Sequence, residues 1–406
     1  MSVSEWREVR IGDIGDVVTG KTPSSKNPEY FGDEIPFVTP TDYKNYHKNI
    51  YSSERYLSQA GKEVLGNKLL PINSVIVTCI GSDMGKVAIN KVECITNQQI
   101  NSIILKRDLA DSDFIYYTLI SMQEYLKMLA RGGTTMPIVN KSTFEEIKLL
   151  LPPFPEQKAI AATLSVLDDM IELNNQINKT LEEMAQAIFK SWFVDFEPFK
   201  DGEFEESELG LIPKGWRVVE LGEITEEIRE RVKDRKIPVF SAVKTGDLVL
   251  SEDYFTKQVF SRDISKYIVV KPFDFAYNPA RINIGSIGIN EFSYTGCVSP
   301  VYVVFRTDQK YKWFFKMLTR TERFKKEVNT RASGSVRQTL NFDEFSKIKV
   351  VYPYAEIVEE YNYIFEGLIM AKSKIEEEIS ILSEIRDTLL PKLMSGEIRV
   401  PVEEVV

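Results

Sequence analysis

Two long stretches of the chain carry the apolar spacing of coiled-coil helices. From Glu156 onward, apolar residues recur at alternating intervals of three and four positions, and the same spacing returns towards the C-terminus. Each stretch predicts a helix of about 35–40 residues, or ~55 Å at 1.5 Å per residue. The seam positions are Leu164, Leu167, Ile171, Asn174, Asn178, Leu181 and Ile188 in the first helix, and Leu368, Ile375, Ile379, Leu382 and Leu389 in the second.

Each of these helices needs a partner for its seam. The chain holds no other seam of equal length, so we expect the two helices to form an antiparallel intramolecular coiled coil. The alternative is that each helix packs on its own domain. Asparagine at two seam positions is expected to fix the register at a cost in stability. Lys372 and Arg386 interrupt the second seam, and Asp168 and Asp169 are expected to be solvated surface.

The remaining segments have the pattern of mixed, β-rich domains. Short β-branched runs over 74–78, 100–105, 266–270 and 300–305 predict strands, separated by loops rich in glycine, asparagine and proline. Residues 113–130 and 310–328 carry helical apolar spacing. Prolines at 152, 153 and 353 then end each domain.

The chain is an internal repeat. Residues 133–193 align with 334–394 without a gap at an offset of 201, whereas Trp6 matches Trp216 at an offset of 210, so the first copy is nine residues longer. The predicted fold is therefore α+β, with two β-rich domains joined by two long helices around a pseudo-twofold axis. The predicted divisions are a first domain at 1–155, a helix and linker at 156–205, a second domain at 206–355, and a helix and tail at 356–406.

Charge divides along the same boundaries. The net charge of −9 is the sum of −1 and +6 for the two domains and −7 for each helical segment. Acid is thus concentrated in the helices, and the domains remain compatible with a nucleic-acid partner.

Composition excludes several kinds of chemistry. The chain has no apolar run of the ~18 residues that a membrane helix needs, and its first six residues lack the pattern of a signal peptide, so a cytoplasmic protein is expected. Cys79, Cys94 and Cys297 lack metal-type spacing and are expected to be buried, reduced thiols rather than metal or redox groups. His47 is the only histidine, which removes most histidine-based catalysis and leaves no expected metal site.

No catalytic motif is complete. The Leu-Pro-Pro-Phe at 151–154 resembles the Asn-Pro-Pro-Phe loop of amino-methyltransferases, but leucine cannot accept hydrogen bonds from an amine. Asn278 to Arg281 lacks the aromatic residue that would stack on a flipped base. Glu146 to Lys148 fits the end of a nuclease metal site, but Lys347 replaces the acid in the second copy. No catalytic residue is therefore predicted, although a standalone methyltransferase or nuclease remains an alternative.

Polar loops in both copies combine cations for phosphates with short donors and acceptors for base edges. A glycine-flanked arginine loop recurs at the same place in each half, where glycine lets backbone N–H groups approach a phosphate. For any one of these residues, an ordinary surface role is an equal alternative, and a coiled-coil scaffold without DNA binding is a third possibility for the whole chain. The candidate DNA contacts are Lys21, Thr22, Lys26, Thr41, Tyr43, Lys44, Ser82, Lys86, Arg131, Thr134 and Thr135 in the first copy, and Lys244, Thr245, Asn278, Arg281, Asn283, Lys325, Lys326, Arg331, Ser333, Ser335 and Arg337 in the second.

Four features in order along the chain resemble one family, the specificity subunits of type I restriction-modification enzymes. The first is the tryptophan near the start of each copy, Trp6 and Trp216. The second is the stretch from Asn140 to Ile147-Lys148 that continues into the Pro-Pro-Phe-Pro-Glu-Gln of 152–157. The third and fourth are the Ile-Phe-Lys-Ser-Trp-Phe-Val-Asp-Phe of 188–196 and the Leu-Pro-Lys-Leu-Met-Ser-Gly-Glu-Ile of 390–398. The resemblance covers essentially the whole chain.

The resemblance implies a sequence-specific DNA-recognition subunit that reads a bipartite site in double-stranded DNA. It further implies that the two helices dock two methyltransferase subunits and that motor-nuclease restriction subunits complete the complex. S-adenosylmethionine, ATP and Mg are then expected in the partner subunits, and this chain is expected to be non-catalytic and to bind no cofactor.

Overall fold

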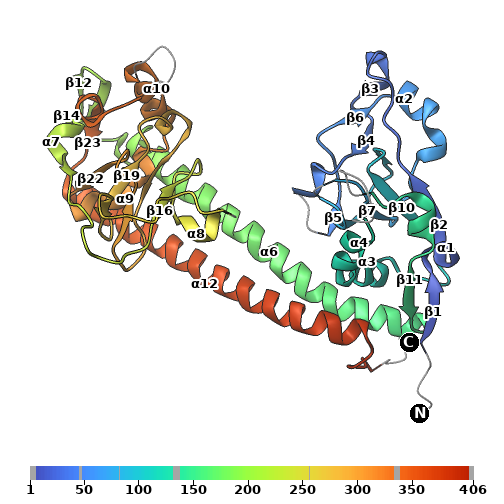
Figure 1. Cartoon of the computed structure of the whole chain (residues 1–406). Helices are drawn as coiled ribbons and strands as arrows, with labels where there is room; N and C mark the ends of the chain where they lie inside the picture. Colours follow the sequence, from blue (N-terminus) through green and yellow to red (C-terminus); the bar gives the residue numbers. More distant parts are fainter. Residues whose placement is uncertain are drawn as a thin grey trace. The chain divides into compact units, whose positions relative to one another are not determined.

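The computed structural model describes residues 6–44, 48–81, 83–130, 138–255, 257–332 and 339–401. Its internal contacts divide the chain into two compact units. Unit 1 comprises Met1–Ile177 and Ile375–Val406, and unit 2 comprises Asn178–Lys374. Each unit therefore contains one copy of the repeat together with part of both long helices, α6 (Phe154–Phe193) and α12 (Ala355–Met394) (Figure 1).

Unit 1 is built on a five-stranded sheet in the order β2, β10, β7, β8, β5, and a four-stranded sheet in the order β3, β6, β4, β9. In the larger sheet every pairing is antiparallel except that of β5 with β8. The first and last strands of the copy, β1 and β11, pair with each other and so bring its two ends together. The strands are β1 (Arg7–Arg10), β2 (Gly15–Thr19), β3 (Phe31–Gly32), β4 (Ile35–Val38), β5 (Asn49–Ile50), β6 (Tyr56–Leu57), β7 (Val75–Thr78), β8 (Val87–Asn90), β9 (Ile95–Thr96), β10 (Ile100–Leu105) and β11 (Lys148–Leu151).

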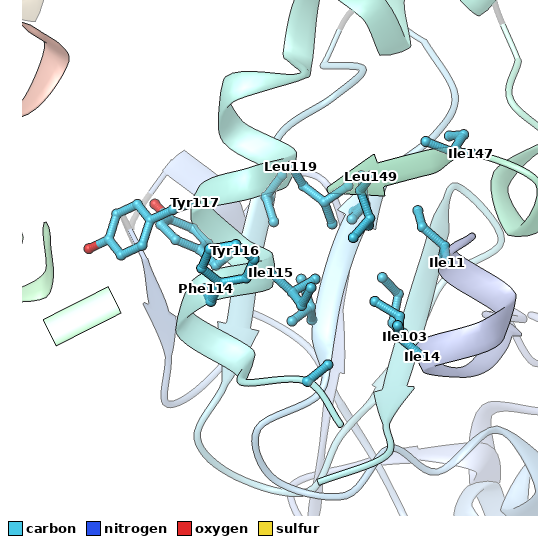
Figure 2. Packing of buried hydrophobic residues seen from close by; sticks show 14 of the residues in the cluster. Ile11, Ile14, Ile103, Phe114, Ile115, Tyr116, Tyr117, Leu119, Ile147 and Leu149 are labelled. Atoms are coloured by element: carbon cyan, nitrogen blue, oxygen red, sulfur yellow. The ribbon is translucent and has the colours of Figure 1, made fainter. Parts of the chain in front are cut away.

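Both faces of this larger sheet are covered, which is why β7 is apolar at successive positions. Val75 and Val77 pack with the helices in one cluster, whereas Ile76 between them packs in a second cluster on the other face. Figure 2 shows the first cluster, with Phe114 and Leu119 beside the aliphatic residues of the sheet. The helices of this copy are α1 (Ile11–Ile14), α2 (Gln59–Val64), α3 (Ser112–Ser121), α4 (Gln123–Ala130) and α5 (Lys141–Glu145).

Unit 2 repeats the framework with a four-stranded sheet in the order β15, β22, β19, β20 and a closing pair of β14 with β23. Its core is more aromatic, with Phe275, Phe305, Phe314 and Phe345 all buried. The strands are β12 (Phe204–Ser207), β13 (Gly210–Pro213), β14 (Arg217–Glu220), β15 (Thr225–Ile228), β16 (Phe240–Ala242), β17 (Leu248–Leu250), β18 (Ile268–Val270), β19 (Phe275–Tyr277), β20 (Ile287–Ile289), β21 (Gly296–Val298), β22 (Val303–Thr307) and β23 (Lys349–Tyr352), and the helices are α7 (Leu221–Ile224), α8 (Ser251–Tyr254), α9 (Lys312–Leu318), α10 (Glu322–Arg331) and α11 (Phe342–Ser346).

The two long helices pair antiparallel within each unit, as the seam pattern predicts. In unit 1 the start of α6 packs with the end of α12, where Leu164 and Leu393 share one cluster, and Asp168 pairs with Arg386 further along α6. In unit 2, the ring of Phe193 at the end of α6 packs edge-to-face against Tyr361 near the start of α12. Of the twelve seam positions, Leu164, Ile171, Asn174, Asn178 and Leu382 are buried, and the other seven are half-buried.

Several element boundaries differ from the predicted ones. Helix α6 begins at Phe154 rather than Glu156. Pro155 is then the second residue of the helix, and a proline is tolerated there because the N–H it lacks would have no intrahelical partner in the first turn. The single helical stretches predicted at 113–130 and 310–328 are each two helices. No glycine or proline marks either break; in the second, the Thr321 side chain caps α10 by accepting a hydrogen bond from the Phe324 N–H.

The prediction that Asp168 is solvated surface is wrong. Its carboxylate accepts a hydrogen bond from the Tyr117 hydroxyl at 2.6 Å and lies 2.9 Å from the Arg386 guanidinium, and only 15% of its side chain is exposed. Figure 2 shows the Tyr117 hydroxyl directed away from the aliphatic residues of the core. Beside it, the buried Lys48 amine pairs with Asp113 at 2.5 Å and donates to Ser165 at 2.6 Å. A polar network thus fastens the first domain to both helices.

Replacing Asp168 with alanine is expected to lower the free energy of unfolding of unit 1 by about 1–3 kcal/mol. The variant leaves the largely buried Tyr117 hydroxyl without its acceptor and removes one of the two carboxylates beside Arg386. Hydrogen exchange of the α3 amides measures the loss. The exposed neighbour Asp169 is the matched control, and Asp169→Ala should change the same amides by less than about 0.5 kcal/mol. Equal effects of the two variants would contradict the network.

The cysteines are buried, free thiols. Burial raises the pKa of Cys79 and of Cys94 from 9.0 to about 12. The folded chain therefore keeps these protons at a pH where the unfolded chain has lost them, so the stability contribution is complete below pH 9 and falls as the pH rises towards 12.

Raising the pH from 8 to 10 is expected to destabilise unit 1 by about 1 kcal/mol per buried thiol. Urea denaturation at both pH values measures the change. Cys94→Ala removes one of the titrating groups, so its stability should fall less steeply with pH than that of the unmodified chain. An identical pH dependence would show that this thiol does not contribute.

Candidate nucleic-acid interface

In unit 1, the polar loops leave the larger sheet at one edge. The strand register places Thr19 opposite Asn101, Ile100 opposite Thr78, and Val77 opposite Val87, so these four strand ends lie side by side. Three loops therefore start or finish there: the segment after β2, the β7–β8 loop, and the β9–β10 turn. We call the described residues of these loops, 20–26, 79–81, 83–86 and 97–99, the unit 1 edge.

Hydrogen bonds tie these loops together. The Lys21 N–H donates to the Thr96 carbonyl at 2.9 Å, and the Cys79 N–H donates to the Gln99 carbonyl at 2.7 Å. Gly20 lies so close to this turn that a Cβ there would overlap the carbonyl oxygens of Thr96 and Asn97, so glycine is required. The chain that follows the glycine-flanked arginine segment also returns here, because the Val139 N–H donates to the Cys79 carbonyl at 2.9 Å.

Unit 2 has the corresponding edge. Ile228 pairs with Val304, Tyr277 pairs with both Val303 and Ile287, and the β19–β20 loop occupies the place of the β7–β8 loop. The β16–β17 turn lies against this loop, since a Cβ on Gly285 would approach the Lys244 carbonyl oxygen to 2.6 Å. We call residues 244–246 and 278–286 the unit 2 edge.

The predicted contact residues divide by exposure. Exposed residues are Lys21, Lys26, Thr41, Lys44, Lys244, Thr245, Arg281, Lys325 and Lys326. Half-buried residues are Thr22, Lys86, Asn278, Asn283 and Arg331. Ser82, Arg131, Thr134, Thr135, Ser333, Ser335 and Arg337 lie outside the described residues.

Some of the candidate cations have partners within the chain. Lys86 pairs with Asp83 at 2.5 Å, Lys325 with Glu322 at 2.7 Å, and Arg331 with Glu327 at 3.3 Å. These surface pairs are weak and can exchange for phosphate contacts. Lys325, Lys326 and Arg331 lie on α10, which contacts the 3₁₀ turn Ile282–Ile284 of the unit 2 edge.

Tyr43 is buried rather than exposed, as a DNA contact would need to be. Its side chain is 8% exposed and packs with Val38, Ile50 and Leu70 in the cluster on the outer face of the larger sheet. Burial is the main cause that raises the pKa of its hydroxyl well above 10.0. The aromatic residue in a polar loop is therefore part of the core, and the neighbouring Thr41 and Lys44 are the exposed residues of that loop.

The β9–β10 turn was not predicted to be part of the interface. It holds three consecutive amide side chains, Asn97, Gln98 and Gln99, in the middle of the unit 1 edge. A run of amides between two β-branched strands is itself a sequence signal, because such side chains both donate to and accept from base edges.

Within the described ranges, no group of three or more His, Cys, Asp or Glu side chains is arranged to hold a metal ion. The helices described here include none that is long and apolar enough to cross a membrane.

Comparison with known proteins gives a consistent result. The sequence profile of the type I restriction modification DNA specificity domain matches residues 3–183. The type I restriction enzyme MjaIX specificity subunit of Methanocaldococcus jannaschii is 33% identical over 98% of this chain and 94% of that protein. The HindI specificity subunit of Haemophilus influenzae is 24% identical over 98% of this chain and all of that protein. The fold resembles that of a type I restriction-modification S subunit from M. genitalium, with a TM-score of 0.59, 19% identity and 97% of each chain covered.

The chain is a tandem repeat in which each domain continues into a long helix, and its relatives are DNA specificity subunits. The extent and identity of the match to the M. jannaschii protein place it more closely. The chain belongs to the family of type I restriction enzyme specificity subunits, and it recognises DNA target sequences for a restriction-modification complex.

Proposed function

We propose that the chain reads a bipartite site, one half with the unit 1 edge and the other with the unit 2 edge. The observation that carries this proposal is that each unit gathers cations and short polar side chains where its sheet strands end. The two edges carry different residues, such as the amide turn at 97–99 in unit 1 and Arg281 in unit 2. Different half-sites follow from this difference.

The two long helices are proposed to set the half-site separation and to dock two methyltransferase subunits. Beside its seam, α6 carries a second row of apolar residues that face solvent: Val166, Met170 and Leu173 are 58%, 40% and 57% exposed. An exposed apolar row on an acidic helix supports a protein partner rather than DNA. Motor-nuclease subunits would complete the complex.

The chain is proposed to be non-catalytic and to bind no cofactor itself. S-adenosylmethionine would be bound by the methyltransferase subunits, and ATP with Mg by the motor subunits. The incomplete catalytic motifs support this division of labour, since the Leu-Pro-Pro-Phe of 151–154 has no side chain that could accept a hydrogen bond from an amine.

Methyl transfer from labelled S-adenosylmethionine to duplex DNA tests this proposal. The chain alone and the methyltransferase alone are expected to transfer no label, and their complex is expected to transfer it. Transfer by the chain alone would support the standalone enzyme instead. Binding of the complex to DNA should also weaken steeply as salt rises, whereas a flat dependence would favour a scaffold that does not contact DNA.

A further inference from the structure

We propose that Gln98 reads an adenine in the major groove of the half-site bound by the first domain. Gln98 is the exposed member of the amide turn between β9 and β10, and this turn lies between the other loops of the unit 1 edge. The inference rests on the proposed bipartite recognition and names one residue and one base within it.

The turn holds Gln98 in a fixed place. The Asn97 Oδ1 accepts a hydrogen bond from the Gln99 backbone N–H at 3.0 Å, and the Asn97 Nδ2 donates to the Gln99 Oε1 at 3.0 Å. The Gln99 carbonyl in turn accepts from the Cys79 N–H at 2.7 Å. Both neighbours are therefore engaged within the protein. Asn97 is buried and Gln99 is half-buried, so Gln98 is the most exposed of the three.

The side chain of Gln98 is also oriented. The Thr22 hydroxyl donates to its Oε1 at 2.5 Å. This contact uses one of the two lone pairs of Oε1 and leaves the other lone pair directed elsewhere. The Nε2 donors make no hydrogen bond to any other residue that the structure describes. An acceptor and a donor in one plane are thus presented together, and less rotamer freedom is lost on binding.

This arrangement matches adenine. In the major groove adenine offers the N7 acceptor next to the N6 donor, so Nε2 can donate to N7 while the remaining lone pair of Oε1 accepts from N6. Guanine offers two acceptors, N7 and O6, at the corresponding positions. Its O6 would face the Gln98 Oε1, and two acceptors cannot form a hydrogen bond with each other. Exposed Lys21 and Lys26, on the loop next to the turn, are placed to contact the flanking phosphates.

Selection from a library of duplexes with both half-sites randomised tests the inference. The full chain in complex with its methyltransferase is used, and the bound duplexes are sequenced. For Gln98→Ala we expect the preference for adenine at one position of one half-site to fall about 10- to 100-fold. Thr22→Val should weaken the preference at the same position by a smaller factor, because the amide remains but is no longer oriented.

Gln59 provides a matched control. It is an exposed glutamine on α2. Helix α2 follows the end of β6 that pairs with Ile35, at the start of β4, whereas the amide turn follows β9 at the Val38 end of β4. The two glutamines therefore lie at opposite ends of the smaller sheet. Gln59→Ala should leave both half-sites unchanged. The other half-site is the internal reference: if wild-type complex selects no split motif, the proposed function fails, whereas a split motif that Gln98→Ala leaves unaltered overturns only this inference.

Discussion

Inserting one heptad into each long helix is expected to move the two half-sites about three base pairs further apart. Seven residues lengthen a helix by ~10 Å, and base pairs are spaced ~3.4 Å apart along DNA. A heptad also keeps the seam in phase, so the helices can still pair. The insertions are placed between Asn178 and Lys179 in α6 and between Ile375 and Glu376 in α12. Methylation at sites with the original gap should fall by two orders of magnitude or more, since only one half-site can then be bound.

Seven glycine and serine residues inserted after Gly202 control for added length. This position lies between α6 and the β12–β13 hairpin and outside both helices, so the insertion should leave the gap between half-sites unchanged. If the heptad variant still methylated sites with the original gap between half-sites, the helices would not set the spacing.

Replacing Phe193 with alanine is expected to destabilise unit 2 by about 3–5 kcal/mol. The Phe193 ring lies 5.1 Å from the rings of Phe314 and Tyr361 and 6.0 Å from that of Trp216, and it is 7% exposed. The variant therefore leaves a cavity where α6, α12 and the second domain meet. Hydrogen exchange should show lost protection across the unit 2 strands, with the unit 1 strands unchanged.

Met184 is the matched control on the same helix. It is 45% exposed, and Met184→Ala should change unit 2 protection by less than about 0.5 kcal/mol. If Phe193→Ala lowered protection equally in both units, the aromatic cluster would not be the local anchor of the second domain.

The helices could be predicted from sequence because their signal is periodic and local. Every seam position from Leu164 to Ile188 and from Leu368 to Leu389 is buried or half-buried. Asn174 and Asn178 are buried, and each has a side-chain atom without a hydrogen-bond partner among the described residues, which agrees with the expected cost in stability. The single-helix predictions failed at Met122 because no residue there signals a break.

The polar network around Asp168 could not be predicted, because its members lie far apart in sequence. Taken alone, Tyr117, Lys48 and Arg386 each have an ordinary explanation. Only the folded chain brings Tyr117 and Arg386 to the Asp168 carboxylate and places the Lys48 amine beside the Tyr117 hydroxyl. The same reason applies to Tyr43, whose loop composition indicates exposure although the fold buries the ring.

The edges fall between these two cases. Residue type identified the loops that hold Lys21, Lys86 and Arg281, but their convergence follows from a strand order that sequence alone does not fix. The amide turn was missed because β9 before it has only two residues, too few for a strand to be predicted there, so nothing marked residues 97–99 as a turn between strands. The equivalence of the β7–β8 and β19–β20 loops likewise becomes visible only from the register.

The most direct test of bipartite reading is a genome-wide map of methylated bases in cells that express the chain with its methyltransferase. The account predicts a motif in two short, different parts, separated by a gap of fixed length and free composition. Arg281→Ala should relax one part, and Gln98→Ala should relax the other. A single continuous motif, or relaxation of the same part by both variants, would contradict the claim that each domain reads its own half-site.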